Sequence, residues 1–194
     1  EIIPEIEMPS HSEEVLAAYP ELGCSCQAYK DSDFCVGNEA VFEFLETVLA
    51  EVMDVFPSKY IHIGGDEAGK QHWKTCQKCQ QRMKEEGLSG VDELQSYMIR
   101  RIEKFVNSKG RHIIGWDEIL DGSAVPSTVV MSYRGHAPAS RAFEKDMKVI
   151  LAPNRWCYYD YDQEEIKDIP SNHHLFITLR KGYTYDYSKY INPA

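Results

Sequence analysis

The residues with the clearest chemical meaning form the run His62-Ile63-Gly64-Gly65-Asp66-Glu67. Asp66 and Glu67 are adjacent carboxylates at the end of a predicted strand. Because like charges repel, ionisation of one raises the pKa of the other, which favours one proton donor and one anion. The two preceding glycines permit unusual backbone angles, so we expect a ligand to approach the backbone closely there.

A structural explanation of the same pair competes with this one. Asp66 could be the N-cap of a following helix, with Glu67 as a solvated charge in the first turn. A bare Asp-Glu pair favours that explanation, whereas the preceding strand and glycine pair favour acid–base chemistry.

Aromatic residues recur at or just after predicted strand ends. Their rings could stack on the apolar face of a sugar while their polar atoms form hydrogen bonds. Any single aromatic residue is more commonly part of a core, but the repetition at strand ends indicates a binding site. The residues are Trp116, Tyr133, Trp156, Tyr158 and Tyr159.

Other catalytic classes have weaker support. His11, His62 and His72 could form a metal site with the acidic pair, but the HExxH spacing and comparable ligand spacings are missing. We expect His62 to be a buried structural or orienting residue. Cys157 has no obvious base partner and no G-x-S-x-G element is present, which disfavours acyl transfer. Gly-rich phosphate motifs are also absent.

Six cysteines are too few to crosslink a domain of this size. Cys76-x-x-Cys79 could be half of a zinc site, with Cys24-x-Cys26 as the other half. Structural zinc usually has two better-spaced pairs, so we expect plain or disulfide-linked cysteines.

Composition excludes several classes of protein. The 194 residues carry 21 Lys and Arg against 31 Asp and Glu, a net charge of −10, and no basic run. Nonspecific binding to nucleic acid or to an anionic membrane is therefore disfavoured. Hydrophobic residues make up 43%, which is typical of a globular protein, and no apolar stretch reaches the roughly 18 residues of a membrane span.

Periodicity predicts strands that alternate with helices, and hence parallel strands of the α/β class. The predicted strands cover residues 2–8, 59–64, 111–116, 128–133, 148–152 and 175–179, and the predicted helices cover residues 12–18, 38–56, 71–86, 92–110 and 138–146. Polar or aromatic residues follow nearly every strand. In a (β/α)8 barrel such ends converge on one mouth, which favours a barrel over a nucleotide-binding sheet.

Five elements in order resemble the catalytic barrel of glycoside hydrolase family 20, the β-N-acetylhexosaminidases. They are PEIEMPSHS at 4–12, HIGGDE at 62–67, GWDEIL at 115–120, MSYRG at 131–135 and CYYDYDQ at 157–163. The resemblance covers nearly the whole chain. It implies retaining hydrolysis in which the substrate's acetamido carbonyl attacks the anomeric carbon and forms an oxazolinium intermediate. It implies no metal and no organic cofactor.

The resemblance also implies roles for individual residues. Glu67 would be the general acid and then the base, and Asp66 would hold the acetamido N–H. Tyr158 would hydrogen-bond the acetamido carbonyl and aim it. The remaining residues would bind or orient the sugar: Trp116 and Tyr133 in the acetamido pocket, Asp160 on hydroxyls and His11 at the rim.

The sequence departs from the family pattern at several positions. Glu7 and Ser10 stand where Asp and Gly are usual, Tyr133 replaces Trp, and residues 137–140 replace a Gly-Gly turn. These changes affect the expected pocket shape and substrate preference more than the chemistry.

Length is the larger departure. Residues 1–194 resemble a fragment of a TIM-barrel catalytic domain, about the third strand through the seventh, whereas a complete barrel needs roughly 250 residues. Unclosed edges tend to pair with another chain, so we expect self-association and weak or no activity of the isolated fragment.

The expected substrate is a terminal, non-reducing N-acetyl-β-D-hexosamine on an oligosaccharide or glycoconjugate, with N-acetylglucosamine and N-acetylgalactosamine both open. A noncatalytic carbohydrate-binding remnant of the barrel and a metal-dependent hydrolase are the alternatives. The resemblance implies a periplasmic or extracellular location.

Overall fold

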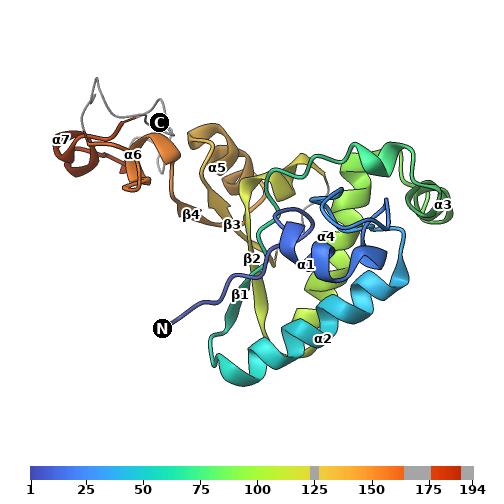
Figure 1. Cartoon of the computed structure of the whole chain (residues 1–194). Coiled ribbons are helices and arrows are strands. Elements are labelled where there is room, and N and C mark those ends of the chain that lie inside the picture. The colour runs from blue at the N-terminus through green and yellow to red at the C-terminus, as the bar shows by residue number, and fades with distance from the viewer. Residues whose placement is uncertain (123–126, 164–175, 189–194) are drawn as a thin grey trace.

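The computed structural model describes residues 1–122, 127–163 and 176–188, and its centre is a parallel sheet (Figure 1). The sheet has the order β1-β2-β3-β4, so strands that are consecutive in the chain are neighbours in space. Ile61 pairs with Ile113, Gly115 with Val130, and Val130 with Val149. The strands are β1 (Tyr60–His62), β2 (His112–Trp116), β3 (Val129–Ser132) and β4 (Lys148–Leu151). This parallel order confirms the predicted α/β class.

The N-terminal segment runs beside β1 but is less regular than the strand predicted over residues 2–8. It forms one isolated parallel bridge, between Glu5 and His62. Backbone hydrogen bonds from His62 N to Pro4 O and from Ile6 N to His62 O, both 2.9 Å, hold it there. Since Pro4 has no N–H to donate, the ladder cannot extend regularly through it.

Long amphipathic helices cover one side of the sheet (Figure 1). They are α2 (Glu39–Val55) and α4 (Val91–Ser108). The Asn38 side chain accepts a hydrogen bond from Ala40 N, which confirms the predicted N-cap of α2. Phe42, Leu49, Ile61 and Met98 form part of the common core at 0% exposure. Each buried side chain of this size contributes about 1.5–3 kcal/mol.

Two predicted elements differ from the structure. The helix expected over residues 71–86 is split into η2 (His72–Lys74) and α3 (Gln77–Glu85), because Cys76 between them is extended. The strand expected over residues 175–179 is wrong where it is described. Phe176 forms only a bridge with Asp162, and α7 (Leu179–Tyr183) begins at Leu179; Leu175 lies outside the described residues.

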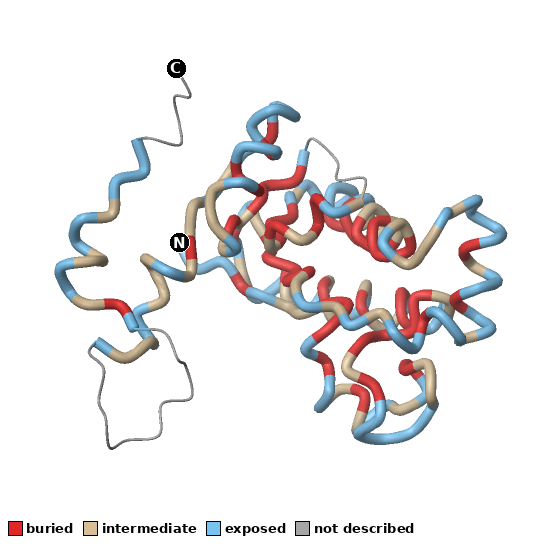
Figure 2. The backbone as a smooth tube through the Cα atoms, turned by 90° about the horizontal axis from the view of Figure 1, so that it is seen from above, coloured by how far each residue is buried: buried red, intermediate tan, exposed pale blue. Residues whose placement is uncertain are grey.

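The remaining short elements connect these parts. They are α1 (Glu13–Ala18), η1 (Pro20–Leu22), η3 (Asp117–Asp121), α5 (His136–Phe143) and α6 (Asn154–Cys157). Figure 2 shows that buried segments gather around the helices, whereas the C-terminal part with α6 and α7 is mostly exposed or intermediate. Among the described residues, the helices are too short or too polar to cross a membrane.

Candidate active site

The acidic pair follows β1 through two glycines in left-handed backbone conformations, Gly64 (φ 67°) and Gly65 (φ 99°). A Cβ atom at Gly64 would lie 1.9 Å from Glu7 Oε2, and one at Gly65 would lie 2.7 Å from Ile119 Cγ2. The glycines are therefore needed for a close approach to the backbone, although from the sequence we expected a ligand to make it. In the structure the chain's own Glu7 and Ile119 make that approach.

Asp66 does not cap a helix. Residues 66–70 have no helical structure, and the next helix, η2, begins at His72 after Gln71. The N-cap explanation of the pair is wrong for this reason. Glu67 adopts a positive φ of 52°, which is uncommon for a residue with a side chain and marks a constrained loop.

His11 joins the two carboxylates. Its Nε2 atom lies 3.4 Å from Asp66 Oδ2 and 3.4 Å from Glu67 Oε2. The two acids differ in exposure, at 16% for the Asp66 side chain and 62% for that of Glu67. Asp66 Oδ1 is buried without a hydrogen-bond partner among the described residues. The three side chains are also close enough to share a cation.

His62 and Trp116 are fixed by Glu5. Glu5 Oε1 accepts a hydrogen bond from Trp116 Nε1 at 2.9 Å and lies 3.0 Å from His62 Nδ1. The two rings meet edge to face, with centroids 5.1 Å apart. His62 is 5% exposed, which confirms the predicted buried, orienting residue. His72 pairs with Asp31, so neither His62 nor His72 joins the acidic pair.

Trp116 and Tyr133 form a second wall of the site. Their ring centroids are 5.4 Å apart in an edge-on arrangement, and Tyr133 Oη donates to Glu118 Oε1 at 2.6 Å. Asp117 is fully buried and accepts from the backbone N–H groups of Tyr133 at 2.8 Å and Arg134 at 3.0 Å. Asp117 therefore fixes the end of β3 against the end of β2.

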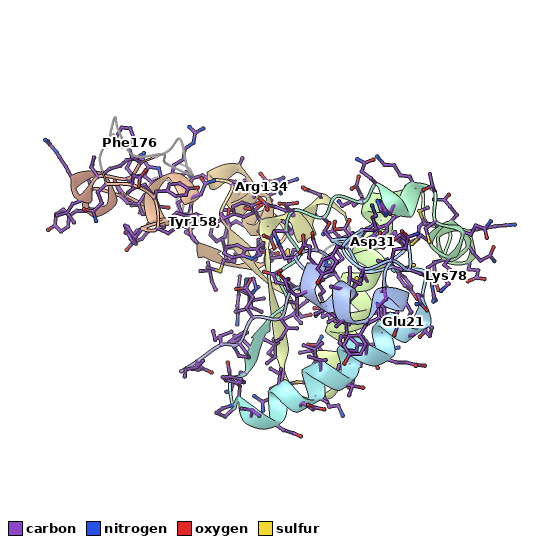
Figure 3. All side chains as sticks on the ribbon, in the orientation of Figure 1. Glu21, Asp31, Lys78, Arg134, Tyr158 and Phe176 are labelled. Atoms are coloured by element: carbon purple, nitrogen blue, oxygen red, sulfur yellow. The ribbon has the colours of Figure 1, made fainter. Side chains whose placement is uncertain are left out.

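Tyr158 lies at the C-terminal end of α6, and its ring meets Tyr161 at 5.6 Å. Figure 3 places it on the same side of the molecule as Arg134, remote from Lys78. Burial raises the pKa of Tyr158 to about 12, and the charges of Tyr161, Asp66, Asp160 and Glu67 add to this. Asp160 is exposed.

Two further aromatic residues named in the sequence analysis contact the C-terminal segment around α7. Trp156 packs against Tyr185, at 5.6 Å between centroids, and under the Lys181 ammonium. Tyr159 is 70% exposed and lies against Gly182 of α7. Trp156, within α6, and Tyr159, after it, thus pack on the C-terminal segment, and their expected place in a sugar pocket stays a prediction.

Comparison with known proteins identifies the family. The model of the catalytic domain of glycosyl hydrolase family 20 matches residues 1–192. The chain belongs to this family. A β-hexosaminidase of Porphyromonas gingivalis is 41% identical over 194 residues, which cover 95% of this chain and 25% of the relative. A β-hexosaminidase of Vibrio furnissii is 34% identical, over 95% of this chain and 32% of the relative.

Solved structures of the family share the fold. The exo-β-N-acetylglucosaminidase of Vibrio harveyi, solved with N-acetylglucosamine, superposes with a TM-score of 0.88 at 27% identity, over 100% of this chain and 32% of that chain. The chain thus spans about a quarter to a third of the length of the relatives it matches. Its parallel sheet is part of a family 20 TIM barrel, as predicted.

The pKa values of two carboxyl groups in this family 20 site are raised, whereas the hydrogen bond with His62 lowers the pKa of Glu5. Burial raises the pKa of Glu7 to about 7, and the charges of Asp66 and Glu5 add to the shift. Burial also raises the pKa of Asp66, with contributions from Glu118 and Glu67. Burial alone would lower the pKa of His11, but Asp66, Glu7 and Glu67 outweigh it and raise that pKa.

The raised pKa of Glu7 predicts a pH-dependent stability. The folded state holds this proton more tightly than the unfolded state, where the ordinary value is 4.5. The stabilisation is therefore present below that value and is lost as the pH rises through about 7. We expect the free energy of unfolding to fall by about 1–2 kcal/mol over this window, allowing for solvent screening.

Replacing Glu7 by Gln, which mimics the protonated side chain, should remove much of this fall. Denaturant unfolding at about pH 5 and pH 8 measures the difference. Glu14→Gln, at an exposed position of α1, is the matched control and should keep the pH dependence. An unchanged dependence in Glu7→Gln would show that Glu7 does not carry it.

Sequence reasoning missed Glu5 as a member of the site and noted Glu118 only as a polar residue at a strand end. Glu5 and Glu7 are two residues apart in an extended segment, so they project to the same side, and this spacing could have indicated both. Glu118 follows β2 directly after Asp117, and the sequence alone could not show which of the two acids turns inward.

Proposed function

We propose that the protein hydrolyses terminal, non-reducing N-acetyl-β-D-hexosamine residues with retention of configuration, using the substrate's own acetamido group as the nucleophile. The observation that carries this proposal is the unequal environment of adjacent acids. Asp66 is largely buried with a free oxygen, whereas Glu67 is open to solvent, and both lie 3.4 Å from His11.

The buried acid, Asp66, is suited to binding the substrate. Asp66 Oδ1 has no partner among the described residues, and a buried unpaired acceptor is costly. An acetamido N–H of the substrate would supply the missing donor. As the oxazolinium forms, positive charge develops next to this carboxylate, which strengthens the contact in the transition state.

The exposed acid suits proton transfer. Glu67 can reach both a leaving-group oxygen and solvent water, so it can act first as acid and then as base. Adjacent residues have Cα atoms only about 3.8 Å apart and serve one region of the sugar. A retaining pair that includes an enzyme nucleophile instead flanks the bond with carboxyl groups about 5–5.5 Å apart. Attack by the substrate's carbonyl removes the need for that second position.

The remaining aromatic residues suit the sugar. Trp116 and Tyr133 offer ring faces and edges at the ends of β2 and β3, and Tyr158 supplies a hydroxyl that can bind the acetamido carbonyl. With its raised pKa of about 12, Tyr158 keeps its proton and acts as a donor at neutral pH.

We also propose that further strands cover the edge formed by β4. This strand is unlike β1 and β3, since its residues are all exposed or intermediate, with Ile150 at 37%. An apolar edge strand of this kind normally pairs with another strand. In the whole protein, the rest of the barrel or a second chain would supply it.

The test is product analysis on the full-length protein. With 4-nitrophenyl N-acetyl-β-D-glucosaminide or -galactosaminide, proton NMR should detect the β-anomer of the free sugar first. The corresponding β-glucoside, which has no acetamido carbonyl, should not be cleaved. First appearance of the α-anomer would contradict the proposal, and sugar binding without turnover would support a noncatalytic protein. Turnover that persists in chelator would exclude the metal-dependent hydrolase.

A further inference from the structure

Four cysteine thiols converge on the side of the molecule formed by α3. Sγ–Sγ distances are 3.7 Å for Cys24 and Cys79, 3.6 Å for Cys35 and Cys76, and 3.7 Å for Cys35 and Cys79. All four sulfur atoms lie within 4.8 Å of one another. The six cysteines form no disulfide. From the sequence we favoured plain or disulfide-linked cysteines and named Cys26 as a ligand only in the alternative zinc site. In the structure Cys35 joins the cluster in place of Cys26, which is exposed.

The spacing of the sulfurs matches a tetrahedral metal site. Four thiolates at about 2.3 Å from a central zinc ion lie about 3.8 Å from one another. A disulfide needs two sulfur atoms about 2.0 Å apart, and a pair of disulfides does not require all four to be close. Cys35 and Cys79 are fully buried, so an ion there would be closed to solvent.

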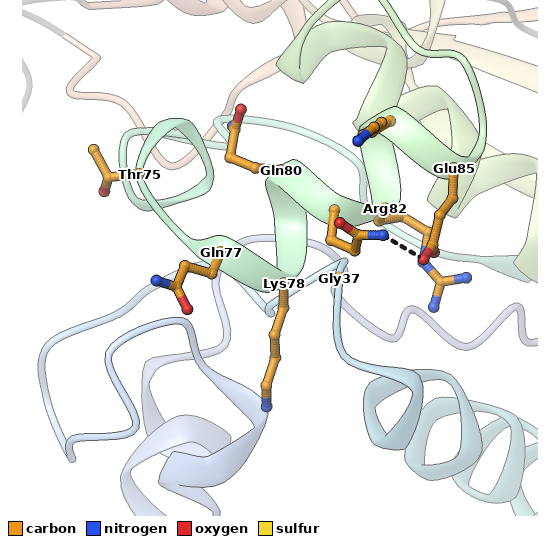
Figure 4. Close-up of a pocket in the computed structure, with 9 residues that line it drawn as sticks. Gly37, Thr75, Gln77, Lys78, Gln80, Arg82 and Glu85 are labelled. Atoms are coloured by element: carbon orange, nitrogen blue, oxygen red, sulfur yellow. Dashed lines mark hydrogen bonds between the residues drawn. The ribbon is translucent and has the colours of Figure 1, made fainter.

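The surrounding backbone is built around these sulfurs. A Cβ atom at Gly37 would lie 2.1 Å from the Lys78 carbonyl carbon and 2.3 Å from Cys79 N. Only glycine lets this loop pass so close to α3, beside Lys78 and Gln77 (Figure 4).

We propose that Cys24, Cys35, Cys76 and Cys79 bind one structural zinc ion. Four thiolates leave no open coordination position, so the ion takes no part in the reaction. The ligands come from two segments, 24–35 before α2 and 76–79 at the start of α3. This inference does not depend on the proposed function.

The ion would stabilise the loop that carries the acids. Segment 24–35 already holds that loop, since Asp33 accepts from Gly69 N at 3.3 Å and Lys70 N at 2.7 Å. Trp73 Nε1 also donates to Phe34 O at 2.9 Å. A metal bridge between the same two segments would fix the distance between them and limit the motion of residues 66–76.

Metal analysis of the full-length protein is the test. We expect one zinc per chain as purified, and near-zero zinc in Cys35→Ser and Cys79→Ser. Cys26→Ser and Cys157→Ser, which replace the two cysteines outside the cluster, are the matched controls and should keep the zinc. Because a ligand variant can fail to fold, the parent protein should also be refolded with Co²⁺, where thiolate-to-cobalt charge-transfer absorption is expected.

Several results would overturn the proposal. Two disulfides among these four residues, found by mass spectrometry without reduction, would exclude the ion. Four titratable thiols in a folded protein without metal would do the same. Iron in place of zinc would refute the identity of the metal, and zinc lost in His11→Ala but kept in Cys79→Ser would place it at the carboxylates.

Discussion

Replacing Glu67 by Gln should lower kcat of the full-length protein by about 10²–10⁴-fold on a 4-methylumbelliferyl N-acetyl-β-glucosaminide. Gln has nearly the same shape as Glu but carries no transferable proton. Glu67 is 62% exposed and makes its one close charged contact, among the described residues, with His11. The loss should therefore come from chemistry, with little change in stability.

The dependence on the leaving group separates this role from a structural one. A 2,4-dinitrophenyl leaving group departs with little help from an acid, so the cleavage step in Glu67→Gln should be much less impaired with that substrate. Glu43→Gln, an exposed acid on α2, is the control and should match the parent. Equal losses on both substrates would argue against a general acid, and retention of most activity would contradict the assignment.

The parts of the fold that sequence predicted are those set by local patterns. Helix α2 has an N-cap at Asn38 and a continuous apolar face, so its bounds differ from the prediction by one residue at each end. Strands β1 to β4 are short apolar segments bounded by turns, and their parallel pairing follows from the intervening helices. Where a local pattern met a tertiary constraint the prediction failed, as at Cys76, whose extended backbone divides the expected helix.

The sequence predicted those site residues that lie at strand ends. It could not predict how deeply each side chain is buried. Trp116 is the last residue of β2, Tyr133 follows β3 directly, and Asp66 and Glu67 lie a few residues beyond β1, so a strand pattern alone brings all four to strand ends. Their roles stay predictions. Which of the two acids is buried, however, is decided by tertiary packing around their loop, which has no local sequence signal. The cysteine cluster was not predicted, because Cys24 and Cys35 are separated by ten residues of loop in the sequence and come together only in the folded chain.

Replacing Asp66 by Asn should lower kcat/KM by about 10²–10³-fold, the range for removing one preorganised electrostatic contact from a transition state. The carboxylate oxygen that has no partner becomes part of a neutral amide, so the charge that would stabilise an oxazolinium is lost. The N–H of the substrate can still find the amide oxygen, which predicts a smaller change in KM than in kcat.

Substrates with altered acyl groups make this test specific to Asp66. Fluorination of the acetyl group weakens its carbonyl as a nucleophile, so kcat of the parent should fall from acetyl to fluoroacetyl to trifluoroacetyl. In Asp66→Asn the fall of kcat with each added fluorine should be steeper or shallower than in the parent. In Glu67→Gln this fall should match the parent, and only the dependence of kcat on the leaving group should change. If both variants responded in the same way to both series, the two acids would share one function. The division of roles inferred from their unequal burial would then be wrong.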